Sequence, residues 1–289
     1  MAGRPHKLAG VPEGHVIHRL SEGLSSRFGQ RRVAVASPQG RFAAAAELLD
    51  GTGLVAAEAV GKHLLIDFEG GRTVWIHLGL IGKLRFGPVE AVLPQPQTLR
   101  LRISADQQAA DLRGPQWCRL IDPAERAAVV QSSGPDPLRA DADPERAWRK
   151  VQASARPIAV LLMDQKVFAG VGNIFRAEVL FRHGIDPLLP AKALPRPVFD
   201  SVWADLVELM RCAVASGRID TVADAHLPEA MGRPPRVDAH GGEVYVYRRL
   251  AEPCLVCGTP VSGATLAGRN LYWCPACQPA GCAGHGLEL

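Results

Sequence analysis

Two pairs of cysteines near the end of the chain have the spacing of a metal site. Cys254 and Cys257 are separated by two residues, as are Cys274 and Cys277, and sixteen residues lie between the pairs. Four thiolates at this spacing are the usual ligands of a structural zinc ion, in a closed tetrahedral site. The sequence therefore predicts one structural Zn²⁺ rather than a catalytic metal; two disulfides are the alternative interpretation.

The segment between the cysteine pairs, residues 266–273, is interpreted as a β-hairpin with Arg269 at its turn. A zinc ribbon has too little core to place a side chain without its metal, so the ion would position Arg269 indirectly. A zinc ribbon with an arginine is, by itself, a general nucleic-acid-binding module. Cys118, Cys212 and Cys282 fall outside the ligand spacing and are interpreted as ordinary thiols.

A second candidate group is the pair Pro12-Glu13 near the start of the chain. Taken alone, proline and glutamate before an apolar-periodic segment indicate the beginning of a helix. The apolar residues that follow have helical spacing and predict a helix over residues 14–28. The pair acquires a chemical meaning only together with motifs further along the chain.

The elements that would hold these residues change in character near residue 133. Before it, short apolar and β-branched runs broken by Gly and Pro predict strands of a sandwich or barrel. Residues 133–143 are rich in Pro, Asp and Gly and are typical of a linker. Beyond the linker, Asp143-Pro144-Glu145 is a helix start, and the helical spacing of apolar residues predicts helices over residues 172–183 and 197–215. From residue 245 onward, short strands are expected around the cysteines. The expected strands before the linker include residues 33–35, 63–68, 73–76 and 99–103.

Composition describes an ordinary globular protein, with 47% hydrophobic and 21% charged residues. The net charge of +4 is compatible with nucleic-acid binding but is weak evidence for it. No apolar run reaches the roughly 20 residues of a membrane helix, and the first ten residues lack the apolar core of a secretory signal. We therefore expect a cytosolic protein that makes no membrane contact.

Four blocks, taken in order, resemble the formamidopyrimidine-DNA glycosylase and endonuclease VIII family. They are residues 12–14, residues 61–65, residues 162–166 with 170–174, and the four-cysteine finger with Arg269. The resemblance extends from Pro12 to Gln278. It implies an α+β multidomain fold with an N-terminal β-sandwich and flanking helices, a helix–two-turn–helix domain, and a zinc-ribbon finger. The expected division is an extension at 1–11, the catalytic sandwich at 12–132, the linker at 133–143, the helical domain at 144–243, the finger at 244–278 and a tail at 279–289.

The resemblance also implies roles for individual residues. In the family the mature protein begins at proline, whose secondary amine attacks C1′ of the damaged nucleotide; here that residue is Pro12. An N-terminal amine titrates near ~8, so part of it is nucleophilic at neutral pH. The resulting iminium ion is an electron sink that drives strand cleavage by β- and δ-elimination. Glu13 is implied as the general acid and base, and Lys62, at a turn between two strands, as a proton donor and phosphate ligand.

Further residues are implied to bind DNA. Asn173 would bind a phosphate where the glycine-rich turn at 170–172 leads into a helix, whose N-terminus favours anions. Arg269 would bind phosphate from the finger and assist the last elimination. His77 matches another phosphate contact, and Leu80 lies where the family fills the space left by a base turned out of the duplex. The implied partner is double-stranded DNA with an oxidised base or an abasic site. The resemblance also implies a monomer in the bacterial cytoplasm, associated with the nucleoid.

Three departures from the formamidopyrimidine branch favour endonuclease VIII. The Arg-Arg-Phe wedge of that branch is replaced by Gly-Pro-Gln-Trp-Cys at residues 114–118. No second acidic residue follows Glu13 closely, and Ala159 stands where the branch has a lysine. The sequence therefore favours oxidised pyrimidines over 8-oxoguanine as substrates.

The eleven residues before Pro12 bear on its chemistry, because a proline nitrogen within a peptide bond is an amide and is not nucleophilic. Three explanations are open. Translation starts at Val11, since a GTG codon that initiates is read as methionine and then removed; or the extension is cleaved; or the protein binds damaged DNA without lyase activity. The first is favoured because Val11 occupies the place of an initiator methionine.

Three functions follow from these features. The favoured one is a bifunctional DNA glycosylase and apurinic/apyrimidinic (AP) lyase of base excision repair. The alternative is a non-catalytic damaged-DNA-binding protein with a blocked Pro12. A zinc-ribbon RNA-binding protein is disfavoured, because it leaves Pro12, Glu13, Lys62 and the block at 170–173 without a role.

Overall fold

The computed structural model describes residues 12–90, 95–237 and 242–287. The chain forms two compact units that meet in sequence between Ser132 and Ser133. The expected extension, residues 1–11, lies outside the described residues. Among the described residues, none of the helices combines the length and apolar character needed to cross a membrane.

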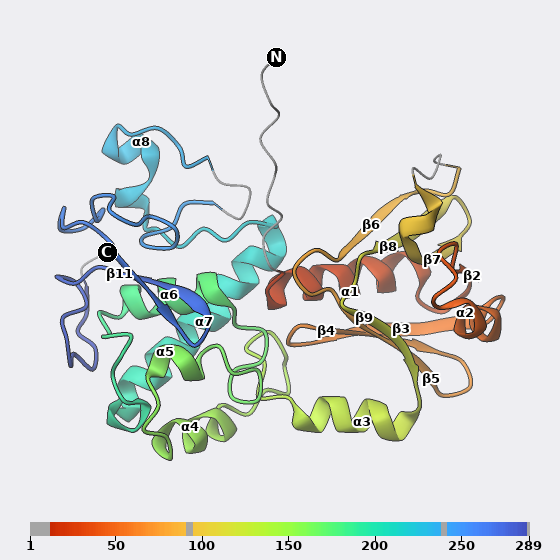
Figure 1. Ribbon diagram of the computed structural model, residues 1–289, viewed down its shortest axis with the longest axis horizontal. Helices are drawn as coiled ribbons and strands as arrows, with labels where there is room; N and C mark the ends of the chain where they lie inside the picture. Colours follow the sequence, from red (N-terminus) through yellow and green to blue (C-terminus); the bar gives the residue numbers. More distant parts are fainter. Residues whose placement is uncertain (1–11, 91–94, 238–241, 288–289) are drawn as a thin grey trace. The chain divides into compact units, whose positions relative to one another are not determined.

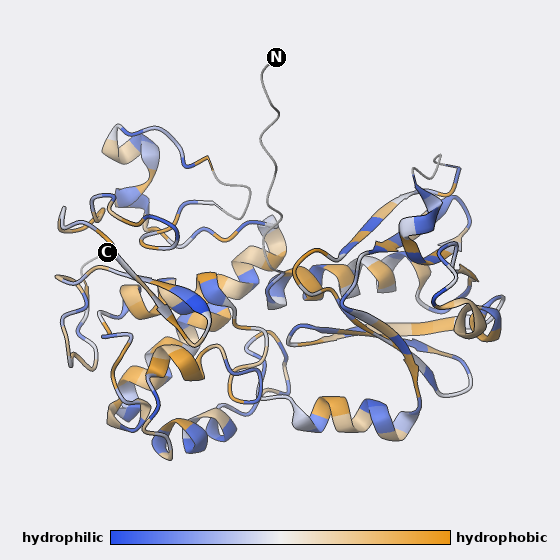
Figure 2. Ribbon diagram, in the orientation of Figure 1, coloured by the Kyte–Doolittle hydropathy of each residue, from blue (hydrophilic) through white to orange (hydrophobic). Residues whose placement is uncertain are grey.

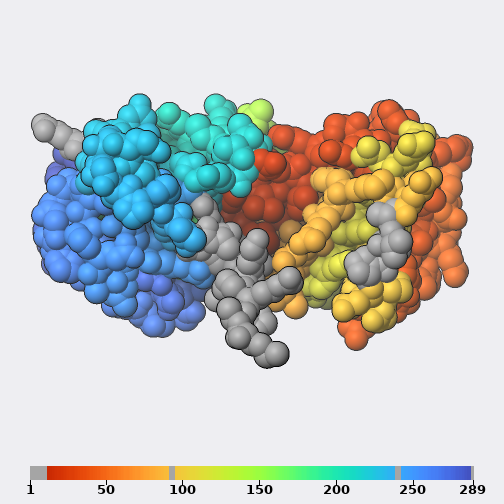
Figure 3. Space-filling view, turned by 90° about the horizontal axis from the view of Figure 1, so that it is seen from above, coloured from red at the N-terminus to blue at the C-terminus, as the bar shows by residue number. Residues whose placement is uncertain are grey.

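The N-terminal unit is a β-sandwich with helices at its sides (Figure 1). One sheet has the strand order β1-β3-β4-β5-β9 and the other has the order β2-β7-β8-β6. In Figure 3, seen from above, gold and yellow residues of this unit lie at the surface of the face in view. The strands are β1 Arg31–Arg32, β2 Ala34–Ala36, β3 Gly53–Val60, β4 His63–Phe68, β5 Arg72–His77, β6 Lys83–Pro88, β7 Leu99–Ala105, β8 Gln108–Arg113 and β9 Trp117–Ile121.

Alternation along the strands builds the sandwich core, because successive side chains of a strand point to opposite faces of its sheet. Leu64 and Ile66 of β4 are fully buried, and they join a core that includes Leu101 of β7 and Leu112 of β8. The helix α1 Gly14–Phe28 has the predicted bounds and contributes Ile17, Leu24 and Phe28 to the same core.

Two helices of this unit were not expected from sequence. The helix α2 Ala43–Leu49 follows the first strands, and α3 Pro123–Ser132 ends the unit. Figure 2 shows an apolar stretch of α3 flanked by polar residues. Its apolar residue Val129 packs against Leu65 and Ile121, which lie on the sheet face away from the main core. A 3-10 turn at Pro96–Thr98 completes the unit.

The C-terminal unit consists of helices and the finger. Asp143 caps α4 by accepting a hydrogen bond of 3.0 Å from the Glu145 backbone N–H, as the helix-start signal predicts. The expected helices at 172–183 and 197–215 correspond to α6 Asn173–Arg182 and α7 Arg196–Ser216. The other elements are α4 Pro144–Gln152, α5 Ile158–Leu161, α8 Pro228–Met231, 3-10 turns at Ala191–Ala193 and Asp224–His226, and the finger strands β10 Ser262–Leu266 and β11 Arg269–Trp273.

The helices and the finger share one apolar core. Phe175 and Phe181 of α6 lie in the same buried cluster as Leu271 of β11 and three of the four cysteines. The segment at 133–137, expected as the start of a linker, is buried in this unit. There, the Gly134 N–H donates to the Gln165 carbonyl at 2.9 Å, so the segment packs as part of the helical unit.

Candidate functional site

The Pro12-Glu13 pair lies at the beginning of α1. Glu13 is the residue before the first helical position, with an extended backbone, and its carbonyl accepts a 3.0 Å hydrogen bond from Val16 N–H. Its side chain is 3% exposed, whereas Pro12 is half-buried. A carboxylate at a helix N-terminus is stabilised by the helix dipole. The structure thus holds a buried acid directly beside the proline.

Lys62 lies at the turn between β3 and β4, as expected. Its charge acts on two histidines. Burial, together with the nearby charges of Arg19, His18 and Lys62, lowers the pKa of His15 from 6.5 to about 4. Burial and then Lys62 also lower the pKa of His77. Lys62 is therefore within electrostatic range of the first turn of α1 and of the end of β5, and both imidazoles are neutral at neutral pH.

The loop between β5 and β6 exposes two neighbouring apolar side chains. Leu80 is 57% exposed and Ile81 is 75% exposed. Leu80 was a predicted site residue, but Ile81 was not, although a second apolar residue in a short glycine-flanked loop was a usable signal. Together they form a small exposed apolar patch on this loop.

Asn173 and Arg269 are brought close together within the C-terminal unit. Asn173 is the first residue of α6, after the extended cap residue Gly172. Its Nδ2 donates a 2.9 Å hydrogen bond to the backbone carbonyl of Asn270, the residue after Arg269. Arg176, 1% exposed, donates to the Asn173 side-chain oxygen and, at 2.7 Å, to the same Asn270 carbonyl.

The hairpin places Arg269 immediately after its turn rather than within it. Leu266 pairs with Arg269 across β10 and β11, and the two connecting residues, Ala267 and Gly268, have φ values of +49° and +72°. Two consecutive residues with positive φ are typical of the tight hairpin turns that match the strand twist. Arg269 is exposed, so its guanidinium is accessible at the end of the hairpin.

Glu178 anchors the segment that leads into the finger, a role that sequence reasoning missed. Its carboxylate is completely buried. It accepts hydrogen bonds of 2.7–2.9 Å from the backbone N–H groups of Tyr245, Val246 and Tyr247, and one of 2.6 Å from the Thr221 hydroxyl. The sequence predicts a strand from residue 245 onward, but residues 245–247 do not form one. Their N–H groups bind the Glu178 carboxylate instead of a neighbouring strand. The signal for Glu178 was an acidic residue within an otherwise apolar helical segment.

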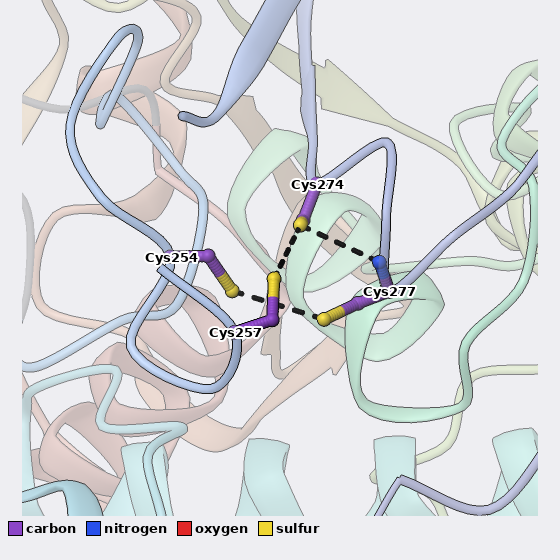
Figure 4. A group of neighbouring side chains, drawn as sticks. All are labelled: Cys254, Cys257, Cys274 and Cys277. Atoms are coloured by element: carbon purple, nitrogen blue, oxygen red, sulfur yellow. Dashed lines mark hydrogen bonds between the residues drawn. The ribbon is translucent and has the colours of Figure 1, made fainter. Parts of the chain in front are cut away.

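The four predicted zinc ligands meet in the finger (Figure 4). Their sulfur atoms all lie within 4.8 Å of one another, with 3.8 Å between Cys254 and Cys277 and 3.5 Å between Cys257 and Cys274. A tetrahedral zinc site with Zn–S bonds of about 2.3 Å requires sulfurs about 3.8 Å apart. The four thiols therefore fit one structural Zn²⁺.

Comparisons with known proteins agree with this arrangement. The sequence model described as the formamidopyrimidine-DNA glycosylase N-terminal domain matches residues 11–121, and that of the formamidopyrimidine-DNA glycosylase H2TH domain matches residues 133–224. A zinc finger found in FPG and IleRS matches residues 251–280. The chain is 47% identical over 274 residues to Endonuclease 8 1 of Mycobacterium tuberculosis, covering 93% of this chain and all of the relative. It belongs to the formamidopyrimidine-DNA glycosylase and endonuclease VIII family.

Other members extend the comparison. A formamidopyrimidine-DNA glycosylase of Synechococcus is 31% identical over 229 residues, covering 76% of this chain and 79% of the relative. The crystal structure of MutM (Fpg) from Thermus thermophilus is 28% identical, with a TM-score of 0.71 over 92% of this chain and 98% of that one. The chain is thus a DNA-repair glycosylase with the family fold and one structural zinc site.

Proposed function

We propose that this glycosylase is bifunctional, removing the damaged base and then cleaving the strand through a covalent intermediate at Pro12. The secondary amine of an N-terminal Pro12 attacks C1′, the bond from C1′ to the base breaks, and the base leaves with a proton. The sugar ring then opens: the C1′–O4′ bond breaks, O4′ takes up a proton, and C1′ becomes the carbon of an iminium ion with the Pro12 nitrogen. The resulting iminium ion acidifies the proton at C2′. Loss of that proton expels the 3′-phosphate, and a second elimination expels the 5′-phosphate.

Glu13 and Lys62 are proposed to move protons in this sequence. The observation that carries the proposal is the buried carboxylate of Glu13 beside Pro12, with Lys62 in electrostatic range of the same helix start. Glu13 protonates the opening sugar ring and later accepts a proton, since an acid held at hydrogen-bonding distance serves in both directions. Lys62 supplies a second proton and binds a phosphate.

DNA with a damaged base or an abasic site is the proposed partner. Asn173 and Arg269 are proposed to bind one stretch of phosphate backbone, because Asn173 binds the carbonyl of Asn270, the residue next to Arg269. A bent duplex releases the damaged base from the stack, and Leu80 fills the space it leaves. His77 is proposed to bind a phosphate on the same side as Lys62, since the charge of Lys62 acts on the His77 imidazole.

Oxidised pyrimidines are the proposed substrates. Residues 114–118, which form the connection from β8 to the start of β9, stand where the resemblance places the wedge of the formamidopyrimidine branch. The 47% identical relative is named an endonuclease 8. Excision assays with thymine glycol and with 8-oxoguanine opposite cytosine test this preference. Faster removal of 8-oxoguanine would overturn it.

Borohydride trapping on abasic-site DNA tests the covalent step. Two matched proteins are compared, one beginning at Pro12 and one retaining residues 1–11, in which the Pro12 nitrogen is an amide. The first should be trapped as a covalent adduct and the second should not, and Pro12→Gly in the shorter protein should strongly reduce trapping. Tight abasic-site binding without trapping, even with Pro12 exposed, would instead favour the non-catalytic DNA-binding function. Intact-mass measurement of the native protein identifies which form the cell contains.

A further inference from the structure

The loop that carries Leu80 and Ile81 is closed by hydrogen bonds at both ends. The Gly79 N–H donates to Nδ1 of His77 at 3.1 Å, and the Gly82 N–H donates to the Leu78 carbonyl at 3.0 Å. Gly79 has φ +66°, a conformation that a residue with a Cβ adopts only with strain. The loop therefore has a defined shape, and its two most exposed side chains lie between the two hydrogen bonds.

The hydrogen bond from Gly79 determines the protonation state of His77. A backbone N–H only donates, so Nδ1 of His77 must accept and the ring proton must be on Nε2. Burial and then the nearby charge of Lys62 lower the pKa of this imidazole, and a side-chain hydrogen bond with Gln116 raises it. The net shift is downward, which favours the neutral form. His77 is thus held as a neutral ring whose inner nitrogen faces the loop backbone.

Neighbouring residues hold the ring in this orientation. Trp117, its partner across β5 and β9, stacks on it with ring centroids 4.5 Å apart and an angle of 29° between the planes. The Gln116 N–H donates to the carbonyls of His77, at 2.9 Å, and Leu78, at 3.3 Å. The Gln116 side chain covers Gly79, since a Cβ placed on Gly79 would lie 2.8 Å from Gln116 Cβ.

We propose that His77 is a positioning residue that holds the loop at residues 78–82 through Nδ1, so that Leu80 and Ile81 enter DNA together as one preformed apolar wedge. This rests on the proposed function and adds Ile81, Gln116 and Trp117 to it. A loop ordered before binding avoids the entropy cost of ordering it on DNA. This role uses Nδ1, whereas the phosphate contact expected of His77 would use the outer nitrogen, Nε2.

Two substitutions separate these roles, because each keeps one of the two nitrogen positions. In His77→Asn the side-chain oxygen takes the place of Nδ1 and can accept from Gly79. In His77→Gln the amide reaches the place of Nε2 instead. If the loop is what matters, His77→Asn should excise the base about tenfold faster than His77→Gln, the size expected for one functional hydrogen bond.

A direct readout of the loop accompanies the rates. Hydrogen exchange of the Gly79 amide should be slow in the unmodified protein and in His77→Asn, and fast in His77→Gln. In the unmodified protein, ¹⁵N spectra of the histidine side chains should show the His77 proton on Nε2. Fluorescence of 2-aminopurine beside the lesion should report slower base opening in His77→Gln.

Three results would overturn the proposal. One is His77→Gln working faster than His77→Asn, which would assign the role to Nε2. Another is equal rates in the two variants, and the third is a His77 proton on Nδ1. Failure of the proposed function would look different from failure of this proposal. The unmodified protein with Pro12 exposed would then excise no base, while hydrogen exchange of the Gly79 amide would still report on the loop.

Circular dichroism verifies that both His77 variants fold. A second pair of variants tests the stacked ring: Trp117→Phe, which keeps a stacking ring, should retain more activity than Trp117→Ala.

Discussion

The Asn173 side chain donates a 2.9 Å hydrogen bond to the backbone carbonyl of Asn270, a residue 97 positions later in the chain. This contact joins the beginning of α6 to the end of the finger hairpin, where Arg269 is exposed. Arg176, buried beneath them, donates to the same carbonyl. The two residues proposed to bind phosphate are therefore held as one surface, and a change in this contact should affect both.

Asn173→Asp should weaken binding to abasic-site DNA by roughly 10- to 100-fold. It places an acceptor opposite the Asn270 carbonyl and a negative charge near the phosphate, and an unsatisfied or repulsive polar contact costs about 1–3 kcal/mol. Fluorescence anisotropy measures the affinity. Asn270→Ala is the matched control, because it keeps the backbone carbonyl and should change affinity less than about threefold. Equal losses in both variants would contradict the role of this contact.

Arg269→Ala should weaken binding to damaged and undamaged duplexes alike. A phosphate contact carries no sequence information, and its loss should lower the slope of log Kd against log salt by about 1. The measurement is a salt titration of the dissociation constant for both duplexes. Arg211→Ala, which removes an exposed arginine of α7, should leave the slope unchanged; a similar change there would mean that only net charge matters.

Removal of zinc should unfold the finger and abolish tight DNA binding. Three of the four ligand cysteines belong to the core of the C-terminal unit, so loss of the ion should also lower the melting temperature of that unit. Elemental analysis should find one zinc per chain, and Cys277→Ser should reduce both zinc content and melting temperature. Cys212→Ser, at an exposed position of α7, is the control and should change neither quantity. A protein that stays folded and binds DNA without zinc would refute the structural role.

Acid should destabilise the N-terminal unit as the pH falls from about 6.5 to about 4. Burial lowers the pKa of both His15 and His63 from 6.5 to about 4 in the folded protein. The unfolded chain therefore binds protons first, and each histidine's contribution, on the order of 3 kcal/mol, is present above pH 6.5 and lost as the pH falls to about 4. Urea unfolding at pH 7.5 and pH 4.5 measures the loss. His63→Gln should make stability less dependent on pH, and an unchanged dependence would contradict this account.

Local sequence patterns were sufficient for much of the fold. The apolar spacing of α1 predicted its bounds, and Asp143-Pro144-Glu145 predicted the start of α4, because helix starts depend on neighbouring residues. The zinc ligands were predicted for the same reason, since each pair is local and only the meeting of the two pairs is not. α2 and α3 were missed because short helices with weak apolar periodicity depend on the sheet that they cover.

The sequence by itself determined which chemical groups are present, namely the proline and glutamate at a helix start, four thiols for one metal ion, and an arginine at the end of a hairpin. Only the tertiary structure decided how several of them are used. The carboxylate of Glu178 binds backbone N–H groups 67 to 69 residues away, Asn173 contacts Asn270, and the ring of Trp117 orients His77. These contacts join segments far apart in the chain. Their partners follow from the packing of strands and helices against one another, which no local spacing of residues contains.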